Sequence, residues 1–420
     1  MSVLLGCIAD DFTGATDLGG FLVKQGFRTI QLNGIPDRNV AIPEVDALVV
    51  ALKSRTIAPD AAITQSLEAL EYLQQLHCEQ FYFKYCSTFD STEKGNIGPV
   101  MDALLEALGA EFTIACPALP VNGRSVYQGH LFVNGVLLNE SGMQHHPLTP
   151  MTDPNLVRFL GKQVKRKVGL VPFEVVDQGA DAIQTFFHEL QATGHRYAVV
   201  DAVSESQLNA IGQAVKDLKL ITGGSGLSIN LAANFELPSL SEKTAARLPK
   251  IPGNGVILSG SCSVRTQEQV AQAEKHFPSF YLDPFQLQKE PGWVEEAIQW
   301  ALTQIPKSPV LIYTTGPPEK VQEIQKALGE DQAGEIIELA LTMVAQALAK
   351  TGVRKFVIAG GETSGAIVKA LGMSQMQIGP EIAPGVPWCV GLGEAPVLLA
   401  LKSGNFGSVD FFHEALEKVS

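Results

Sequence analysis

The stretch Ala9-Asp10-Asp11-Phe12-Thr13-Gly14-Ala15-Thr16-Asp17 decides how the fold of this chain is interpreted. The apolar residues 3–8 precede it and are typical of a buried strand in a parallel sheet. Residues 18–25 follow it with the pattern of a helix. We therefore expect a turn at the carboxyl end of a first strand. In an open α/β sheet, this is the edge at which ligands bind.

The two adjacent carboxylates of this stretch are costly unless something compensates their charge. Like charges as close as those of Asp10 and Asp11 raise one pKa or require a cation or strong hydrogen-bond donors. A structural role is the alternative, because Asp11 or Thr13 could cap the helix that follows. One cap accounts for one residue, whereas the stretch holds three aspartates and two threonines within eight positions. The pattern therefore favours a functional site.

The composition indicates a globular protein of more than one domain. A chain of 420 residues is too long for one ordinary core, so two domains are expected. Hydrophobic residues make up 45% of the chain and charged residues 18%. The 31 Lys and Arg residues against 44 Asp and Glu residues give a formal net charge of −13. This charge disfavours nucleic acid as a partner but allows an anionic metabolite to bind where a few cations are concentrated.

The cysteine pattern and the apolar runs indicate a cytoplasmic protein with no membrane partner. None of the six cysteines forms a Cys-x-x-Cys pair, which argues against structural zinc and a disulfide framework and fits a reducing compartment. The first apolar run lacks a preceding basic region and is interrupted by Asp10, unlike a signal peptide. No apolar stretch approaches the roughly 20 residues that span a bilayer.

Two more turns of the first half carry polar side chains near the ends of apolar strands. Arg55 follows the strand at residues 47–52 and either clamps a carboxylate through two hydrogen bonds or lies in a solvated loop. Lys84 lies in the strand at residues 81–85, and Asp90 lies in the hydroxyl-rich loop that follows. The carboxyl ends of parallel strands meet at one edge of a sheet, so three polar turns together favour a binding site there.

Two other segments of the first half leave alternatives open. Residues 126–138 predict a β-hairpin that turns at Asn134-Gly135, and an inserted hairpin of this kind serves as a lid or as a contact in a homodimer. Residues 222–226 read Thr-Gly-Gly-Ser-Gly and predict either an anion-binding nest or only a tight turn.

A linker is expected at residues 235–255, where three prolines and mixed charges interrupt the pattern of strands and helices. We divide the chain near residue 245 into an N-terminal domain, residues 1–245, and a C-terminal domain, residues 246–420. Strands alternate with helices in both halves. The predicted fold class is therefore α/β, with two domains, largely parallel sheets and a β-hairpin insertion in the first domain.

The second half carries glycine-rich turns. A strand at residues 255–258 ends in a turn of small residues at 259–263, and a strand at 356–359 runs into Gly360-Gly361-Glu362-Thr363-Ser364-Gly365. Glycines let backbone N–H groups approach a phosphate, and hydroxyl donors at a helix N-terminus add to such a site. The Walker P-loop, the Gly-x-Gly-x-x-Gly fingerprint in either domain's first turn and the Gly-x-Ser-x-Gly elbow do not occur. An acidic site on one domain and a phosphate-compatible site on the other suit phosphoryl transfer from a nucleotide to a small polar acid.

Five motifs, in the same order along the chain, resemble those of the four-carbon acid sugar kinases. They are residues 9–17, the lysine and Asp-Ser-Thr loop at 83–92, Cys116-Pro117-Ala118-Leu119-Pro120, the glycine loop at 360–365 and the closing segment Leu401-Lys402-Ser403-Gly404-Asn405-Phe406-Gly407. The similarity covers essentially the whole chain. It is greatest to the branch whose members use ATP to phosphorylate the 4-hydroxyl of a 3-oxo-tetronate.

The resemblance implies an acid-sugar domain followed by an ATP-binding domain. The residues that match its substrate motif are Asp10, Asp11, Thr13, Gly14 and Asp17, and those that match its nucleotide motifs are Ser259, Gly361, Glu362, Thr363, Ser364 and Gly404. It also implies ATP and Mg²⁺ as cofactors, with the metal held largely by phosphate and water, so no protein ligand is assigned.

The chemistry of the side chains suggests finer roles. Asp11 or Asp10 would accept the proton of the attacking hydroxyl. Arg55 and Lys84 would bind the substrate carboxylate, and Asp90 is expected in the same pocket. A kinase acting on threonate or erythronate is the alternative within the family. Outside it, the alternatives are a sugar-acid binding protein without turnover and, disfavoured by the missing glycine fingerprint, a nicotinamide-dependent oxidoreductase.

Overall fold

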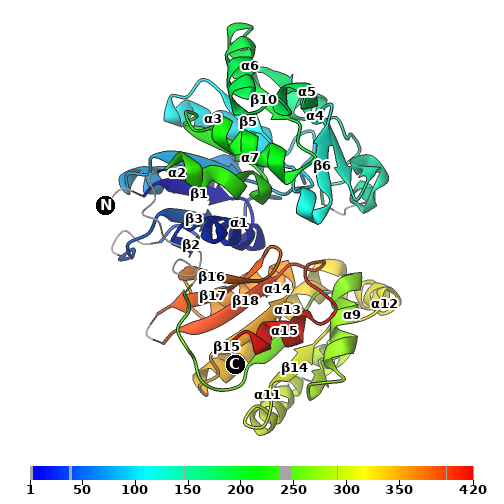
Figure 1. Ribbon diagram of the computed structural model, residues 1–420. Helices are drawn as coiled ribbons and strands as arrows, with labels where there is room; N and C mark the ends of the chain where they lie inside the picture. Colours follow the sequence, from blue (N-terminus) through cyan, green and yellow to red (C-terminus); the bar gives the residue numbers. More distant parts are fainter. Residues whose placement is uncertain are drawn as a thin grey trace. The chain divides into compact units, whose positions relative to one another are not determined.

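The computed structural model describes residues 3–36, 40–145, 148–235, 247–290, 292–393 and 395–419. The chain divides into two compact units, Met1–Ala246 and Arg247–Ser420 (Figure 1). The boundary predicted at residue 245 and the first part of the predicted linker lie outside the described residues.

The first unit is built on parallel strands. Five of them have the order β11-β4-β1-β3-β2, and three more have the order β5-β10-β9. The two sets adjoin, because the N–H of Cys116, just after β5, donates to the carbonyl of Thr222 in β11. The strands are β1 (Leu5–Ala9), β2 (Thr29–Asn33), β3 (Ala47–Ala51), β4 (Gln80–Lys84), β5 (Thr113–Ala115), β9 (Lys167–Val171), β10 (His195–Val200) and β11 (Leu220–Gly223).

Helices cover these strands and bury both of their faces. All five residues of β1 are buried, as are those of β3 and β4, which explains their nearly continuous apolar sequences. The helices are α1 (Phe12–Lys24), α2 (Pro59–Gln75), α3 (Ile97–Leu108), α4 (Leu156–Gly161), α5 (Phe173–Val176), α6 (Ala180–Ala192) and α7 (Glu205–Ala214), with short 3-10 segments η1 (Pro120–Asn122), η2 (Leu138–Glu140), η3 (Gly142–His145) and η4 (Ser225–Asn234).

The predicted hairpin is part of a small antiparallel sheet of three strands, β6 (Arg124–Tyr127), β7 (His130–Val133) and β8 (Val136–Leu137). The turn at Asn134-Gly135 joins β7 to β8, as expected from the sequence. A second turn at Gln128-Gly129, where both residues have positive φ, joins β6 to β7 and was not predicted.

The second unit has one sheet with the order β16-β17-β18-β15-β12-β14-β13. Its five strands from β18 to β13 are parallel, and β17 runs antiparallel to both neighbours. The strands are β12 (Val256–Ser259), β13 (Ser279–Tyr281), β14 (Val310–Tyr313), β15 (Lys355–Ala359), β16 (Gln375–Ala383), β17 (Val386–Leu392) and β18 (Val397–Lys402). The helices are α9 (Val264–Ala273), α10 (Pro284–Lys289), α11 (Trp293–Gln304), α12 (Pro318–Leu328), α13 (Glu330–Lys350), α14 (Gly361–Ala370) and α15 (Phe411–Glu417).

The core of this unit includes a cluster around the fully buried Trp388 of β17. The indole N–H donates to the carbonyl of Ala415, so the polar atom of this large side chain is satisfied at the end of α15. The β16–β17 hairpin was not predicted from the sequence. The predicted α/β class, with two units, largely parallel sheets and an antiparallel insertion in the first, is confirmed.

Candidate active site

The polar residues of the first unit meet at the carboxyl edge of its sheet. Asp10 directly follows β1, and β1 pairs on one side with β3 and on the other with β4. Ala9 is in register with Ala51 and with Lys84, so the ends of the three strands are level. The N–H of Arg55 donates to the carbonyl of Asp10 at 3.2 Å, which fixes the loop after β3 beside the acidic stretch.

Arg55 compensates the two adjacent carboxylates. Its Nε and Nη2 donate to the two oxygens of Asp10, both at 2.9 Å, and Nη2 also donates to Oδ1 of Asp11 at 2.6 Å. Its Nη1 lies 3.7 Å from Oδ2 of Asp90. The alternative of a solvated loop for Arg55 is therefore wrong, since its guanidinium is held by carboxylates on the expected edge.

Asp11 combines the two roles that the sequence left open. Its Oδ2 accepts hydrogen bonds from the N–H of Gly14 at 3.2 Å and from the hydroxyl of Thr13 at 3.0 Å, so Asp11 is the N-cap of α1. Its Oδ1 faces the ammonium of Lys84 at 3.5 Å as well as Arg55. The helix begins at Phe12, not after residue 17 as predicted, because this cap starts it inside the acidic stretch.

The two aspartates have opposite electrostatic environments. Burial raises the pKa of Asp10 above its ordinary value, although Arg55 acts against it. Burial acts in the same direction on Asp11, but the charges of Arg55 and Lys84 and the hydrogen bonds from Thr13 and Gly14 outweigh it and hold the pKa of Asp11 well below its ordinary value. Asp11 is therefore ionised at neutral pH, and its side chain is 24% exposed against 6% for Asp10.

Position 14 requires a glycine because the side chains of Lys84 and Asp11 lie too close to its Cα for a side chain to fit. A Cβ added to Gly14 would lie 2.0 Å from Nζ of Lys84 and 2.1 Å from Oδ1 of Asp11. No side chain fits there without displacing the cation from the carboxylate. This explains why a helix-disfavouring residue stands in the first turn of α1.

Two other predicted residues are buried. Asp90 faces Arg55 of this cluster and accepts a hydrogen bond from the hydroxyl of Thr88. Asp17 lies further along α1 and accepts a hydrogen bond from the hydroxyl of Ser225. Asn96 was not predicted as part of the site. Its side-chain amide donates to the carbonyls of Ser54 and Ile57 at 2.7 and 2.8 Å and so holds the loop that carries Arg55. An asparagine just ahead of a helix was the only sequence signal for it.

The glycine-rich residues 222–226 make a close backbone contact. A Cβ on Gly223 would lie 2.4 Å from the carbonyl oxygen of Cys116, and one on Gly226 would lie 2.5 Å from that of Ala118. The glycines are therefore explained by the packing of the chain after β5 against the end of β11. This supports the tight-turn alternative over an anion-binding nest.

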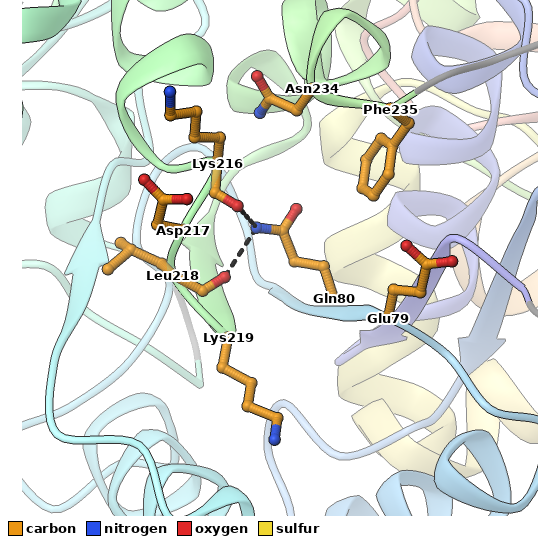
Figure 2. A pocket seen from close by; sticks show the side chains of 8 residues that line it. All are labelled: Glu79, Gln80, Lys216, Asp217, Leu218, Lys219, Asn234 and Phe235. Atoms are coloured by element: carbon orange, nitrogen blue, oxygen red, sulfur yellow. Dashed lines mark hydrogen bonds between the residues drawn. The ribbon is translucent and has the colours of Figure 1, made fainter.

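A pocket of about 340 Å³ lies at the opposite, amino edge of the same sheet (Figure 2). Gln80, the first residue of β4, lines it and donates through Nε2 to the carbonyls of Lys216 and Leu218, as Figure 2 shows. Lys84 is at the other end of the same strand. The pocket is therefore separate from the acidic cluster. The side-chain amide of Gln80 holds the segment between α7 and β11 in place.

In the second unit, three turns converge at the carboxyl edge of the neighbouring strands β12, β15 and β18. The N–H of Ser261, after β12, donates to the carbonyl of Ala359 at the end of β15. The N–H of Gly360 donates to the carbonyl of Lys402 at the end of β18, at 2.8 Å. A Cβ on Gly404 would lie 3.0 Å from Oγ of Ser261, so the closing segment packs tightly on the small-residue turn.

The predicted nucleotide residues lie on these turns. Ser259 is fully buried, and its hydroxyl is 2.7 Å from that of Thr315. Gly360 has φ of 129° and is the N-cap of α14, so the helix starts at Gly361 with Glu362 exposed in its first turn. Thr363 and Ser364 are buried behind that turn, and within the described residues the hydroxyl of Ser364 has no hydrogen-bond partner.

This edge can hold the phosphates of a nucleotide. Helices α14 and α9 both begin at this edge, and the N–H groups of a helix N-terminus attract anions. The unsatisfied hydroxyl of Ser364 and the small turn residues agree with that chemistry. Across the described ranges, no three His, Cys, Asp or Glu side chains are grouped as a metal site.

An α/β fold with an acidic, cation-balanced site in one unit and a phosphate-compatible edge in the other defines a two-domain, nucleotide-using class of protein. Comparison with family models identifies the class. Residues 5–231 match a model described as a sugar-binding N-terminal domain, and residues 256–412 match one described as a nucleotide-binding C-terminal domain. The chain belongs to the family that these two domains define, the four-carbon acid sugar kinases.

Relatives named 3-oxo-tetronate kinase resemble the chain over nearly its whole length. It is 52% identical to a 3-oxo-tetronate kinase of Burkholderia multivorans over 415 residues, which cover 98% of this chain and 96% of the relative. It is also 52% identical to a 3-oxo-tetronate kinase of Pseudomonas fluorescens over 420 residues, covering 99% and 97%.

Solved structures have the same fold. A Haemophilus influenzae protein superposes with a TM-score of 0.83 at 48% identity, covering 99% of this chain and 100% of its own. A Salmonella typhimurium LT2 protein, described as a candidate tRNA synthase, superposes with a TM-score of 0.91 at 44% identity, covering 99% of both chains. In the parts of the chain that the structure describes, no helix is long and apolar enough to cross a membrane.

Proposed function

We propose that the protein is an ATP-dependent kinase that phosphorylates the 4-hydroxyl of 3-oxo-tetronate. The cluster of Asp10, Asp11, Arg55 and Lys84 carries this proposal, because it combines an ionised carboxylate with two cations at one sheet edge. A small sugar acid needs both, a cation for its carboxylate and an acceptor for its reacting hydroxyl. The relatives named 3-oxo-tetronate kinase, which are 52% identical to this chain over nearly its whole length, support 3-oxo-tetronate as the substrate.

Asp11 is the better candidate for the base. Both oxygens of Asp10 are held by Arg55 and its side chain is almost buried, whereas Asp11 is more exposed and remains ionised. Asp11 would accept the hydrogen bond of the 4-hydroxyl and take its proton as the oxygen attacks the γ-phosphorus. The bond from that phosphorus to the oxygen that bridges it to the β-phosphate would break, and ADP would leave with the bonding electrons. Phosphoryl transfer of this kind depends mainly on such positioning and on neutralisation of charge.

Lys84 and Arg55 would bind the substrate carboxylate. Nη1 of Arg55 makes no hydrogen bond to a described residue, and its nearest recorded ion pair, with Asp90, is 3.7 Å long. This nitrogen can therefore bind an incoming anion while Nε and Nη2 keep Asp10 and Asp11 in place. Thr13, Gly14, Asp17 and Asp90 complete the proposed substrate site.

The second unit would bind ATP through Ser259, Gly361, Thr363, Ser364 and Gly404. Glu362 is exposed at the start of α14 and can add one carboxylate to a magnesium ion that is otherwise held by phosphate and water. Magnesium, bound together with ATP, would neutralise charge on the β- and γ-phosphate oxygens. The six cysteines are all free thiols, which supports a reducing, cytoplasmic setting.

A coupled assay of ADP release tests the proposed function. The purified protein is supplied with ATP and magnesium and with 3-oxo-tetronate generated in the reaction from its precursor, or with D- or L-threonate or D- or L-erythronate. Turnover with the oxo acid in preference to the others is expected. Turnover with a threonate or erythronate would keep the reaction and replace the substrate, and no ADP release with any acid would reject the kinase.

A further inference from the structure

Lys402, the last residue of β18, has an unusual environment. Its side chain is fully buried, and lysine is almost never fully buried unless it is paired with an acid. Among the residues that the structure describes, its ammonium donates only to neutral oxygens, the hydroxyl of Thr266 at 3.0 Å and the carbonyls of Ser403 and Gly404 at 3.1 and 2.7 Å. No ion pair to Lys402 occurs within the described ranges of the chain.

Hydrogen bonds of the main chain and the side chain connect Lys402, directly or through Thr266, to each of the three turns on this edge. The carbonyl of Lys402 accepts the N–H of Gly360 at the start of the glycine loop. Thr266, in the first turn of α9, is 2.8 Å from the carbonyl of Gly404 and 3.2 Å from the hydroxyl of Ser261. The ammonium therefore ties the closing segment to the helix that follows the small-residue turn.

The charge of Lys402 is unbalanced at a place that already favours anions. The N-termini of α9 and α14 converge there, and each adds partial positive charge. A buried cation without a carboxylate costs free energy, which a bound anion recovers. The nucleotide phosphates of the proposed reaction have the required charge.

We propose that Lys402 is a positioning residue for ATP, which holds the Gly404 segment against Thr266 and supplies the positive charge beneath the phosphate turns. The inference rests on the proposed function. It assigns to this residue the assembly of the nucleotide site, not a contact with the reacting atoms.

The same unit contains a matched control. Lys355, the first residue of β15, is 6% exposed and donates to the carbonyl of Val419 at 2.8 Å, with no ion pair among the described residues. It lies at the opposite end of a strand that pairs directly with β18. Lys355→Met therefore removes a buried lysine of the same sheet without touching the phosphate edge.

The test compares Lys402→Met and Lys355→Met with the wild type. We expect Lys402→Met to raise the KM for ATP about 10- to 100-fold, the loss expected for hydrogen bonds from a charged group, and to leave the KM for the sugar acid within about twofold. Lys355→Met should change neither constant. Thr266→Val removes one partner of the ammonium and should raise the KM for ATP in the same direction, whereas Thr266→Ser should restore it.

Calorimetric titration with ADP alone separates this inference from the proposed function. If the wild type binds ADP and Lys402→Met binds it equally well, the role of Lys402 is refuted and the kinase is not. An equal loss of affinity in Lys355→Met would also refute it, since a general effect on folding would then explain both variants. If Lys402→Met does not fold, unchanged ADP affinity in Thr266→Val decides against the proposal. If the wild-type protein binds no ADP, both the role of Lys402 and the proposed kinase activity are refuted.

Discussion

The pairing of Arg55 with two aspartates gives a quantitative prediction for Arg55→Met. The change removes three hydrogen bonds of 2.6–2.9 Å and leaves Asp10, whose side chain is 6% exposed, without a cation. Removing one partner of a buried ion pair costs about 3–5 kcal/mol of unfolding free energy. We expect the lower end, about 3 kcal/mol, because Lys84 still faces Asp11 and Asp10 can take up a proton.

The pH dependence of that loss has a definite sign. In the wild type, burial raises the pKa of Asp10, and the charge and hydrogen bonds of Arg55 lower it by a smaller amount. Without Arg55, the pKa of Asp10 in the folded protein therefore rises further above its value in the unfolded chain. The folded variant then binds more protons than the unfolded one just above the ordinary aspartate pKa, so its stability falls as pH rises through that range. The deficit of Arg55→Met relative to the wild type should therefore be smaller near pH 5 than near pH 7.

Arg28→Met is a matched control on the same sheet. Arg28 holds the buried Asp46 through Nε and Nη2 at 3.0 and 2.8 Å, and both residues flank the amino ends of β2 and β3, away from the acidic cluster. This variant should lose about 2 kcal/mol of stability and keep its turnover.

Urea unfolding and steady-state kinetics of the two variants decide the argument. Arg55→Met should lose at least about a hundredfold in kcat/KM, because Asp11 and Asp10 lose the group that positions them. Turnover of Arg55→Met within a few-fold of Arg28→Met would refute a role of Arg55 in the site. A stability loss that does not shrink toward acidic pH would refute the assignment of burial as the cause of the raised Asp10 pKa.

Three further predictions concern single groups. Asp11→Asn should lower kcat by at least about a hundredfold while the affinity for the sugar acid stays equal or increases, and full turnover in kinetic assays would remove Asp11 as the base. Gly14→Ala should push Lys84 off Asp11, raise the KM for the acid about tenfold or more and leave the KM for ATP unchanged; equal effects on both constants would contradict this. Burial, helped by the charge of Arg265, lowers the pKa of Lys402 to about 7, so nucleotide binding should take up a proton and weaken as pH rises above about 7. Calorimetry at about pH 8 in buffers of different ionisation enthalpy should show an uptake that Lys402→Met abolishes, and an uptake that persists in this variant would assign it elsewhere.

The sequence was informative wherever local pattern and sheet topology agree. Apolar runs followed by polar turns predict parallel strands, and the rule that carboxyl ends share an edge of the sheet places residues 10, 55 and 84 together. The helix-capping interpretation of the motif at residues 9–17 is confirmed, because Oδ2 of Asp11 caps α1. Its Oδ1 is left to face Lys84, so the functional interpretation of the same residue stays a prediction that is compatible with the cap.

Other features depend on partners that are distant in the sequence. A lysine at the end of a strand is usually solvated, and nothing local to Lys402 indicates that Thr266 and the Gly404 segment enclose it. The side chain of Asn96 donates hydrogen bonds to a loop about forty positions earlier in the chain, and a bond over that separation cannot be predicted from the local sequence. The turn at Gln128 was missed because glutamine rarely adopts positive φ, and here the buried Asp201 accepts its N–H and that of Gly129.

Phosphorus NMR of the complete reaction tests the central claim most directly. The wild-type protein is mixed with ATP, magnesium and 3-oxo-tetronate, and the γ-phosphate signal is followed with time. We expect this signal to be replaced by that of a phosphomonoester coupled to the protons on carbon 4 of the acid, in equal amount to the ADP formed. Release of inorganic phosphate alone, or an unchanged ATP spectrum while the acid is bound, would contradict it.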